Sequence, residues 1–234
     1  MWAMTMTTNT DNAGGVILDL DGTLVDSVYQ QVVAWRRALD DVGIQLSVWR
    51  IHRRIGMSGD LLINALVRET NRDLDASLVD EVRKRYTVAY AEERMSVRPL
   101  PGARELLQAL TEDGVAWAIA TSSRAANAAP ALEMLGVRDD VAVVTSDQVR
   151  HAKPDPDLFI KAASVLGVDL QQSMVVGDSV WDLLAARRAG ALGVGLLSGG
   201  YGREELERAG AYRVYDDPLD LLGHLDEVGL RRAF

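Results

Sequence analysis

Five short apolar runs, most of them separated by helical patterns, constrain the fold of this chain more than any other feature. Each run has the length and composition of a buried strand, whereas the intervening segments have helical spacing. The runs cover residues 16–20, 115–120, 141–145, 174–177 and 192–197, and the helical segments include 103–112, 125–135, 156–166 and 182–189. This alternation predicts an α/β fold with a mainly parallel, Rossmann-like sheet, which binds ligands at the carboxyl ends of its strands.

The alternation is interrupted once, directly after the first run. Only helix-like segments occur there, at 28–42, 60–70 and 76–94. An insertion at this point would lie over the strand ends, where it would serve as a lid. The proline-rich return at 97–102 is typical of a hinge or boundary, although it could also be an ordinary loop. We therefore expect a flexible tail (1–13), an α/β core (14–27 and 97–234) and an inserted helical cap (28–96).

Composition limits the functions open to the chain. Its 234 residues are 48% hydrophobic, which is enough for a sizeable core, and they include no cysteine, so disulfides and thiolate sites are excluded. The net charge of -9 argues against a nucleic-acid partner. The first 12 residues lack the features of a secretory signal, and no apolar run is long enough to span a bilayer. We expect a cytoplasmic protein without a membrane partner, either a monomer or a homodimer.

The first apolar run ends in two carboxylates. Side chains alternate along an extended strand, so Asp19 and Asp21 lie on the same side, where their charges repel unless a cation or a shared proton intervenes. Gly22 permits a tight turn, and Thr23 can donate to the loop or to a neighbouring carboxylate. A strand end with solvated aspartates is the structural alternative. The pattern favours metal binding or acid–base chemistry.

Three later segments place polar residues at predicted strand ends. Thr121 and Ser122 follow the second run, where hydroxyls and amides could hold a phosphoryl oxygen or simply cap a helix. Lys153 precedes a proline-restricted turn, and a lysine considered alone is usually a solvated charge. Asp178 and Asp182 follow the fourth run, where they fit the oxygen ligands of Mg²⁺ or the first turn of a capped helix.

Taken in order, these segments resemble the four motifs of the haloacid dehalogenase superfamily of phosphohydrolases. The first is D-L-D-G-T-L-V-D-S at 19–27 and the second is T-S at 121–122. K-P-D-P-D-L-F at 153–159 is similar to the third, and G-D-S-V-W-D at 177–182 to the fourth. With its helical insertion, the chain resembles the helical-cap phosphatases, including phosphoglycolate phosphatases and β-phosphoglucomutase-like proteins.

The resemblance implies covalent phosphoryl transfer with a role for each motif. Asp19 would attack phosphorus to form an aspartyl-phosphate, and Asp21 would act first as acid and then as base. Other side chains and a metal would offset charge on the phosphoryl oxygens. The implied phosphate-binding residues are Thr121, Ser122 and Lys153; the implied Mg²⁺ ligands are Asp19, the backbone carbonyl of Asp21 and Asp178, with Asp182 acting indirectly.

Substrate choice would come from the cap. Arg53 and Arg54 lie in a polar turn at 52–59, where a guanidinium could bind a substrate carboxylate or second phosphate, or could be a solvated basic group. His151 is interpreted as a loop histidine without a catalytic role. The expected substrate is a small phosphorylated metabolite, such as phosphoglycolate or a sugar phosphate.

Other functions of this superfamily remain open to different degrees. Asp21 argues against the dehalogenase and phosphonatase branches, which do not share this acid. A β-phosphoglucomutase-like phosphotransferase would use the same core motifs and is the main alternative. A catalytically silent binding module is less favoured, because none of the nucleophile, lysine and metal-binding acids is missing.

Overall fold

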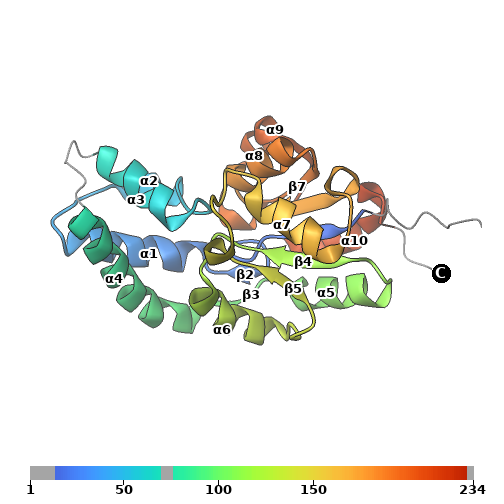
Figure 1. Cartoon of the computed structure of the whole chain (residues 1–234), viewed down its shortest axis with the longest axis horizontal. Coiled ribbons are helices and arrows are strands. Elements are labelled where there is room, and N and C mark those ends of the chain that lie inside the picture. Colours follow the sequence, from blue (N-terminus) through green and yellow to red (C-terminus); the bar gives the residue numbers. More distant parts are fainter. Residues whose placement is uncertain (1–13, 70–75, 231–234) are drawn as a thin grey trace, which may run out of the picture.

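A six-stranded parallel sheet forms the centre of the protein, which we describe from a computed structural model over residues 14–69 and 76–230 (Figure 1). The segment predicted as a tail, 1–13, lies outside the described residues. The strand order is β5-β4-β1-β6-β7-β8. Its strands are β1 (Val16–Leu18), β4 (Trp117–Ala120), β5 (Ala142–Val144), β6 (Met174–Gly177), β7 (Leu192–Leu196) and β8 (Ala211–Tyr215). The predicted fold class is confirmed.

Helices cover both faces of this sheet. They are α5 (Ala103–Glu112), α6 (Ala125–Leu135), α7 (Asp157–Leu166), α8 (Val180–Ala189), α9 (Arg203–Ala209) and α10 (Pro218–Gly223). Single 3₁₀ turns occur as η1 (Arg94–Ser96), η2 (Ser146–Gln148), η3 (Leu170–Gln172), η4 (Leu197–Gly199) and η5 (Leu225–Val228).

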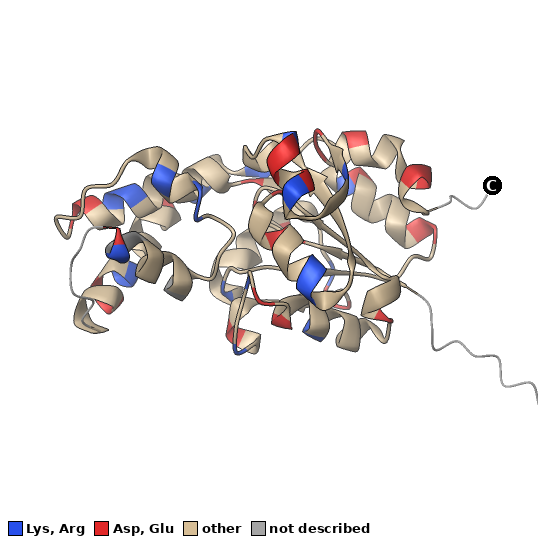
Figure 2. Cartoon of the chain, turned by 90° about the horizontal axis from the view of Figure 1, so that it is seen from above, with Lys and Arg blue, Asp and Glu red and all other residues tan. Residues whose placement is uncertain are grey.

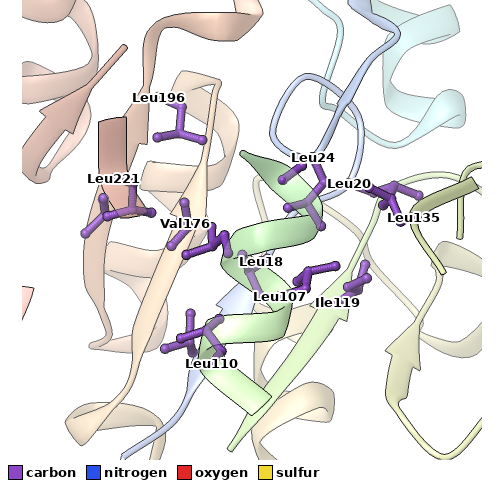
Figure 3. Close-up of a cluster of buried hydrophobic side chains, with 14 of the residues drawn as sticks. Leu18, Leu20, Leu24, Leu107, Leu110, Ile119, Leu135, Val176, Leu196 and Leu221 are labelled. Atoms are coloured by element: carbon purple, nitrogen blue, oxygen red, sulfur yellow. The ribbon is translucent and has the colours of Figure 1, made fainter. Parts of the chain in front are cut away.

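The core follows from the alternation of side chains along each strand. In β1, Leu18 belongs to the hydrophobic cluster that includes α5, whereas Ile17 packs on the opposite face with α7. Figure 3 shows Leu107 and Leu110 of α5 beside the buried side chains of the central strands. Because both faces of the sheet are buried against helices, the sequence of each central strand is a continuous hydrophobic run.

Four helices are inserted between β1 and the rest of the sheet, as Figure 1 shows. They are α1 (Val28–Asp40), α2 (Val48–His52), α3 (Gly59–Arg68) and α4 (Ala76–Glu93), and the short antiparallel strands β2 (Val25–Asp26) and β3 (Arg98–Pro99) join them to the core. Trp35 of α1 stacks on Tyr86 of α4 with ring centroids 4.0 Å apart, inside a separate hydrophobic cluster. Separate clusters support the proposed division into core and cap.

Predicted and observed elements agree best where the apolar pattern is strong. The bounds of α5, α6 and β6 coincide with the prediction, whereas α2, β8, α9 and α10 were not predicted. In β8, Tyr212 and Arg213 are exposed at the edge of the sheet, so the strand lacks a continuous apolar run. Short helices such as α2 contain too few turns for a helical repeat of apolar residues to be recognised in the sequence.

Acidic and basic residues are interspersed along the ribbon of both the core and the insertion in the view of Figure 2. Within the described part of the chain, no helix has the length and apolar character needed to cross a membrane.

Candidate active site

The buried pair Asp19 and Lys153 lies at the centre of the site. Asp19 directly follows β1 and is 3% exposed, and Lys153 is fully buried before α7. The Lys153 Nζ atom is 2.5 Å from Asp19 Oδ1 and 2.8 Å from Asp182 Oδ1. The ammonium therefore bridges two carboxylates, one in the loop after β1 and the other in the first turn of α8, the helix that follows β6. Parallel strands place the segments after β1 and β6 at the same edge of the sheet.

Asp21 has a different environment from Asp19, two residues away. It is partly exposed, and its carboxylate accepts hydrogen bonds from two serine hydroxyls. Ser27 Oγ donates to Asp21 Oδ1 at 2.7 Å, and Ser123 Oγ donates to Asp21 Oδ2 at 2.7 Å. Gly22 makes the turn behind it with φ of 83°, a conformation that favours glycine. The carboxyl group is thus oriented by neutral donors and remains reachable from solvent.

Asp178 follows β6 and is also buried. Thr23 Oγ1 donates to Asp178 Oδ1 at 2.9 Å, so the first motif positions an acid of the fourth. Two glycines pack directly against the other carboxylate oxygen: a Cβ on Gly199 would lie 1.8 Å from Asp178 Oδ2, and one on Gly22 would lie 2.4 Å from it. The backbone therefore closes tightly around this carboxylate.

Asp182 combines helix capping with contact to Lys153. Its Oδ2 atom accepts from Ser179 N at 3.1 Å and from Ser179 Oγ at 2.5 Å, which forms a capping box at the start of α8. Its Oδ1 atom faces Lys153. Because both oxygens have protein partners, the arrangement favours an indirect role for Asp182 at a metal.

The electrostatics of this cluster fit a divalent cation. Carboxylate oxygens of Asp19, Asp178 and Asp182 lie within 4.8 Å of one another. Three carboxylates face one ammonium, so the fully ionised cluster has a marked excess of negative charge. Burial, opposed by Lys153 and assisted by Asp182, raises the pKa of Asp19 to about 7. A bound cation would relieve this excess without protonation.

Asp178 and Lys153 respond to the same charges in opposite ways. Burial, together with Asp182 and Asp19, raises the pKa of Asp178 well above its usual range. Burial by itself would lower the pKa of Lys153, but Asp182 and Asp19 outweigh it and raise that pKa. Lys153 is therefore a permanent cation in this site.

The second motif connects the core to the insertion. Thr121 is 1% exposed, and its Oγ1 atom accepts from Ser123 N at 3.0 Å. Ser122 Oγ donates to the carbonyl oxygen of Gly56 at 2.9 Å. On the other side, Ser58 N donates to the carbonyl oxygen of Lys153 at 3.2 Å. The loop between α2 and α3 thus contacts the second and third motifs directly.

A cavity of about 440 Å³ lies between the core and the insertion. Asp19, Asp21, Thr121 and Ser122 line it from the core. The insertion contributes a largely apolar and aromatic wall, which includes Gln31, Trp35, Met57, Leu61, Leu62, Ile63 and Tyr86. The sequence carries no separate signal for these wall residues, because those on α1, α3 and α4 have the spacing of ordinary core positions.

Arg53 and Arg54 do not line this cavity. Arg53 forms an ion pair with Glu205 of α9, and its guanidinium lies 4.4 Å from the ring centroid of Tyr201. Arg54 Nη2 lies 3.0 Å from Glu69 Oε1, within the insertion. In this conformation Arg53 joins the insertion to the core, and Arg54 braces the insertion itself.

Several other contacts near the site have only weak sequence signals. Ser27 is the last residue of the first motif and Ser123 directly follows the second, but no spacing rule indicates that they donate to Asp21. Trp181 Nε1 donates to the carbonyl oxygen of Arg53 at 3.2 Å, between the fourth motif and the insertion. His151 has an exposed side chain at the cavity edge, 3.4 Å from Asp157 Oδ2.

Comparisons with known proteins give matches that cover most of the chain. The model of the haloacid dehalogenase-like hydrolase family matches residues 14–190. A phosphoglycolate phosphatase of Agrobacterium fabrum is 31% identical over 186 residues, covering 78% of this chain and 80% of that protein. A phosphoglycolate phosphatase of Rhodospirillum rubrum is 33% identical over 210 residues, with 86% of each chain covered.

A solved structure extends the likeness to the whole fold. The crystal structure of a hydrolase from Pseudomonas syringae has a TM-score of 0.89 and 50% identity, covering 92% of this chain and 99% of that one. The predicted resemblance is confirmed, as is the prediction of an enzyme in the class of phosphoric monoester hydrolases. This chain belongs to the haloacid dehalogenase-like hydrolases.

Proposed function

We propose that the protein is a Mg²⁺-dependent phosphatase that hydrolyses a small phosphomonoester through an aspartyl-phosphate on Asp19. The contrast between two neighbouring acids carries this proposal. Asp19 is buried against Lys153, whereas Asp21 is partly exposed and held by hydroxyls at the floor of the same cavity. One acid is suited to nucleophilic attack and the other to proton transfer.

In the first step, an oxygen of Asp19 attacks phosphorus, and the bond from phosphorus to the ester oxygen breaks. Asp21 donates its proton to that leaving oxygen, so the product alcohol departs neutral. Lys153 lies beside the nucleophile and offsets negative charge in the transition state. Thr121 and Ser122 line the same floor, where their polar groups are positioned to hold phosphoryl oxygens.

In the second step, Asp21 acts as a base. It takes a proton from a water molecule whose oxygen attacks the phosphorus of the aspartyl-phosphate. The bond between phosphorus and the Asp19 oxygen breaks, which restores the carboxylate and releases inorganic phosphate. Ser27 and Ser123 hold both oxygens of Asp21 in place and thereby fix its direction of approach in both steps.

The donor set fits a hard, oxygen-binding cation. Asp19, Asp178 and the backbone carbonyl of Asp21 would hold Mg²⁺, and Asp182 would act through its neighbours. When bound, Mg²⁺ supplies positive charge that stabilises the phosphoryl oxygens during transfer. Thr23 and the glycine backbone around Asp178 keep its carboxylate oriented toward the cluster.

The substrate class follows from the relatives and the cavity together. The relatives from Agrobacterium fabrum and Rhodospirillum rubrum are named phosphoglycolate phosphatases, and a cavity of about 440 Å³ between the core and the insertion suits a small molecule better than a nucleic acid. We therefore propose a small phosphorylated metabolite, of the phosphoglycolate or sugar-phosphate type, as substrate.

The test is phosphate release from a panel of phosphomonoesters with Mg²⁺ and with EDTA. We expect Mg²⁺-dependent release that falls by at least about 1000-fold in Asp19→Asn, because an amide cannot form the aspartyl-phosphate. Circular dichroism establishes that the variant is folded. Equal activity of the wild-type protein and a folded Asp19→Asn variant would exclude this mechanism.

A further inference from the structure

The η4 turn after β7 packs against both segments that carry acids of the proposed metal site. Ser198 Oγ donates to the carbonyl oxygen of Gly22, the residue after Asp21, at 2.6 Å. Gly199 is buried, and a Cβ at this position would lie 1.8 Å from Asp178 Oδ2. One turn therefore contacts the loop after β1 and the acid after β6, and any movement of the turn changes the surroundings of both.

The sequence of this turn does not fix its conformation. Gly199 is followed by Gly200, which has a φ of 87°, in the left-handed region that favours glycine. Two consecutive residues without a Cβ have access to more backbone conformations than other residues do. The backbone N–H of Gly200 closes the turn by donating to the carbonyl oxygen of Leu197 at 2.9 Å. The position of the Gly199 carbonyl group therefore depends on contacts that other segments make with the turn.

The insertion supplies such a contact. His52 is the last residue of α2, and its Nε2 atom lies 2.8 Å from the carbonyl oxygen of Gly199. Because a carbonyl oxygen only accepts, the hydrogen of this bond is on Nε2. The imidazole ring stacks on Tyr29 of α1 with centroids 5.4 Å apart, and its centroid lies 5.6 Å from that of Tyr201. These two rings hold the imidazole in place and so fix the direction of its N–H.

His52 belongs to the insertion but not to the wall of the active-site cavity. Gly56, four residues later, lines that cavity, whereas His52 does not line it and contacts the η4 turn. Since His52 does not border the space open to a substrate, its effect on the reaction passes through Gly199 and Asp178. The insertion thus contacts the core through the η4 turn as well as through Ser122.

We propose that His52 is a positioning residue for the metal site: its hydrogen bond holds Gly199 against Asp178, so the docked insertion raises the affinity of the site for Mg²⁺. This inference rests on the proposed function and deepens it, because it assigns part of the metal affinity to the insertion. Groups that orient a metal ligand contribute to affinity although they do not touch the ion. Coupling between two equilibria is reciprocal, so docking of the insertion is in turn favoured when the site is occupied.

Calorimetric titration with Mg²⁺ tests the proposal without substrate or turnover. His52→Phe keeps an aromatic ring beside Tyr29 and Tyr201 but removes the N–H donor. We expect its Kd for Mg²⁺ to rise by about tenfold, the lower end of the effect of losing a group that orients a metal ligand. His52→Gln cannot stack, but it places an amide N–H near the position of the imidazole Nε2 and should recover part of the affinity. Circular dichroism establishes that both variants are folded.

Tyr201→Phe is the matched control. Like His52→Phe, it keeps a ring and removes one donor between core and insertion, because Tyr201 Oη donates to the carbonyl oxygen of Arg53 at 3.1 Å. The bond that it removes does not involve Gly199, so its Kd for Mg²⁺ should stay close to that of the wild-type protein. An equal rise in both variants would assign the effect to docking in general and overturn the role of His52. An unchanged Kd in His52→Phe, or no Mg²⁺ binding by the wild-type protein, would overturn it as well.

Phosphate release separates this inference from the proposed function. In His52→Phe, kcat should be low at limiting Mg²⁺ and should return toward the wild-type value at saturating Mg²⁺, with little change in KM for the ester. A kcat that stays low at saturation would contradict a role through the metal site. Lack of release by the wild-type protein from every ester would refute the proposed function, while the Kd values for Mg²⁺ would still decide the role of His52.

Discussion

Two acids separated by a single residue acquire opposite properties in this fold. Asp19 is buried with Lys153 against its Oδ1 atom, whereas Asp21 is partly exposed and accepts from Ser27 and Ser123. Both groups are carboxyl groups, so their different properties come from their surroundings: burial beside an ammonium for Asp19, and partial exposure beside two hydroxyls for Asp21. The turn at Gly22 lets both carboxylates reach the same cavity floor.

At the residue scale, the role of Asp21 in proton transfer can be tested by comparing substrates whose leaving groups differ in their need for a proton. Asp21→Asn should lower kcat for an alkyl phosphate by about 100- to 10,000-fold, the usual contribution of a general acid or base. For p-nitrophenyl phosphate, the same substitution should lower the rate of aspartyl-phosphate formation less, because the p-nitrophenolate leaving group needs no protonation. Single-turnover release of p-nitrophenol measures that step separately from hydrolysis of the intermediate.

Asp19→Asn is the reference variant for this comparison, since it should abolish formation of the intermediate for both esters. Equal losses for the alkyl and aryl esters in the first step of Asp21→Asn would contradict the assignment of Asp21 as the acid.

At the scale of elements, the segments that follow the parallel strands carry the residues that we propose act in catalysis. The turn after β1, the loop after β6 and the η4 turn after β7 meet around Asp178. The close approach of η4 depends on Gly199, which has no Cβ to displace the carboxylate. His52 Nε2 of α2 also lies 2.8 Å from the Gly199 carbonyl oxygen, so the same turn contacts the insertion.

Replacing this glycine should weaken metal binding. Gly199→Ala would place a Cβ 1.8 Å from Asp178 Oδ2, which forces the carboxylate or the turn to move. We expect the Mg²⁺ concentration for half-maximal activity to rise by about 10- to 100-fold, as for loss of a group that orients a metal ligand. Gly223→Ala at the end of α10 is the control, because its Cβ would meet no atom within 4 Å. An equal Mg²⁺ requirement in both variants would disprove the role of Gly199.

Across the whole molecule, two hydrophobic clusters are joined at the active site. One lies between the sheet and α5, and the other lies within the insertion. Polar contacts cross between them at Gly56 and Ser122, at Ser58 and Lys153, and at Arg53 and Glu205. The position of the insertion is thus coupled to Ser122 and Lys153, which we propose bind phosphate. The charge of the site in turn affects the stability of the whole chain.

Metal removal should make that stability depend on pH. Since the pKa of Asp19 rises from its ordinary 3.8 to about 7 on folding, the folded state holds an extra proton between these values. Without a divalent metal, the contribution of Asp19 to the free energy of unfolding is largest below about pH 4, and it is lost as the pH rises to about 7. A bound cation favours the ionised carboxylate and should flatten this dependence.

Thermal unfolding across this pH range, in EDTA and in Mg²⁺, measures the effect. A change of 1 kcal/mol shifts the Tm of a chain this size by about 2–4 °C. We expect the Mg²⁺-induced rise in Tm to be larger at pH 7.5 than at pH 5. Asp19→Asn removes the titrating group and should lose part of the slope seen in EDTA. A wild-type slope equal to that of Asp19→Asn would contradict the assignment to Asp19.

The sequence by itself determined the parallel sheet and which segments meet at its edge. Apolar runs such as 174–177 mark buried strands, and parallel strands bring their carboxyl ends together whatever lies between them. Polar residues that follow such runs, including Asp19 and Asp178, could therefore be assigned to one site. The local sequence pattern is sufficient to assign these residues to one site, because a parallel sheet brings the carboxyl ends of its strands to the same edge.

Only the tertiary structure decided what surrounds that site. Arg53 pairs with Glu205, 152 positions away, and leaves the cavity to Arg83, Arg124 and Arg150. The direction of a long, flexible side chain depends on the residues that it contacts, and the local sequence does not indicate contacts with distant segments. For the same reason, Tyr86, which stacks on Trp35, has the spacing of an ordinary core residue of α4, and only the tertiary structure shows that it lines the same cavity as Asp19 and Asp21. The strand ends follow from backbone periodicity, whereas the cavity wall follows from packing between distant segments.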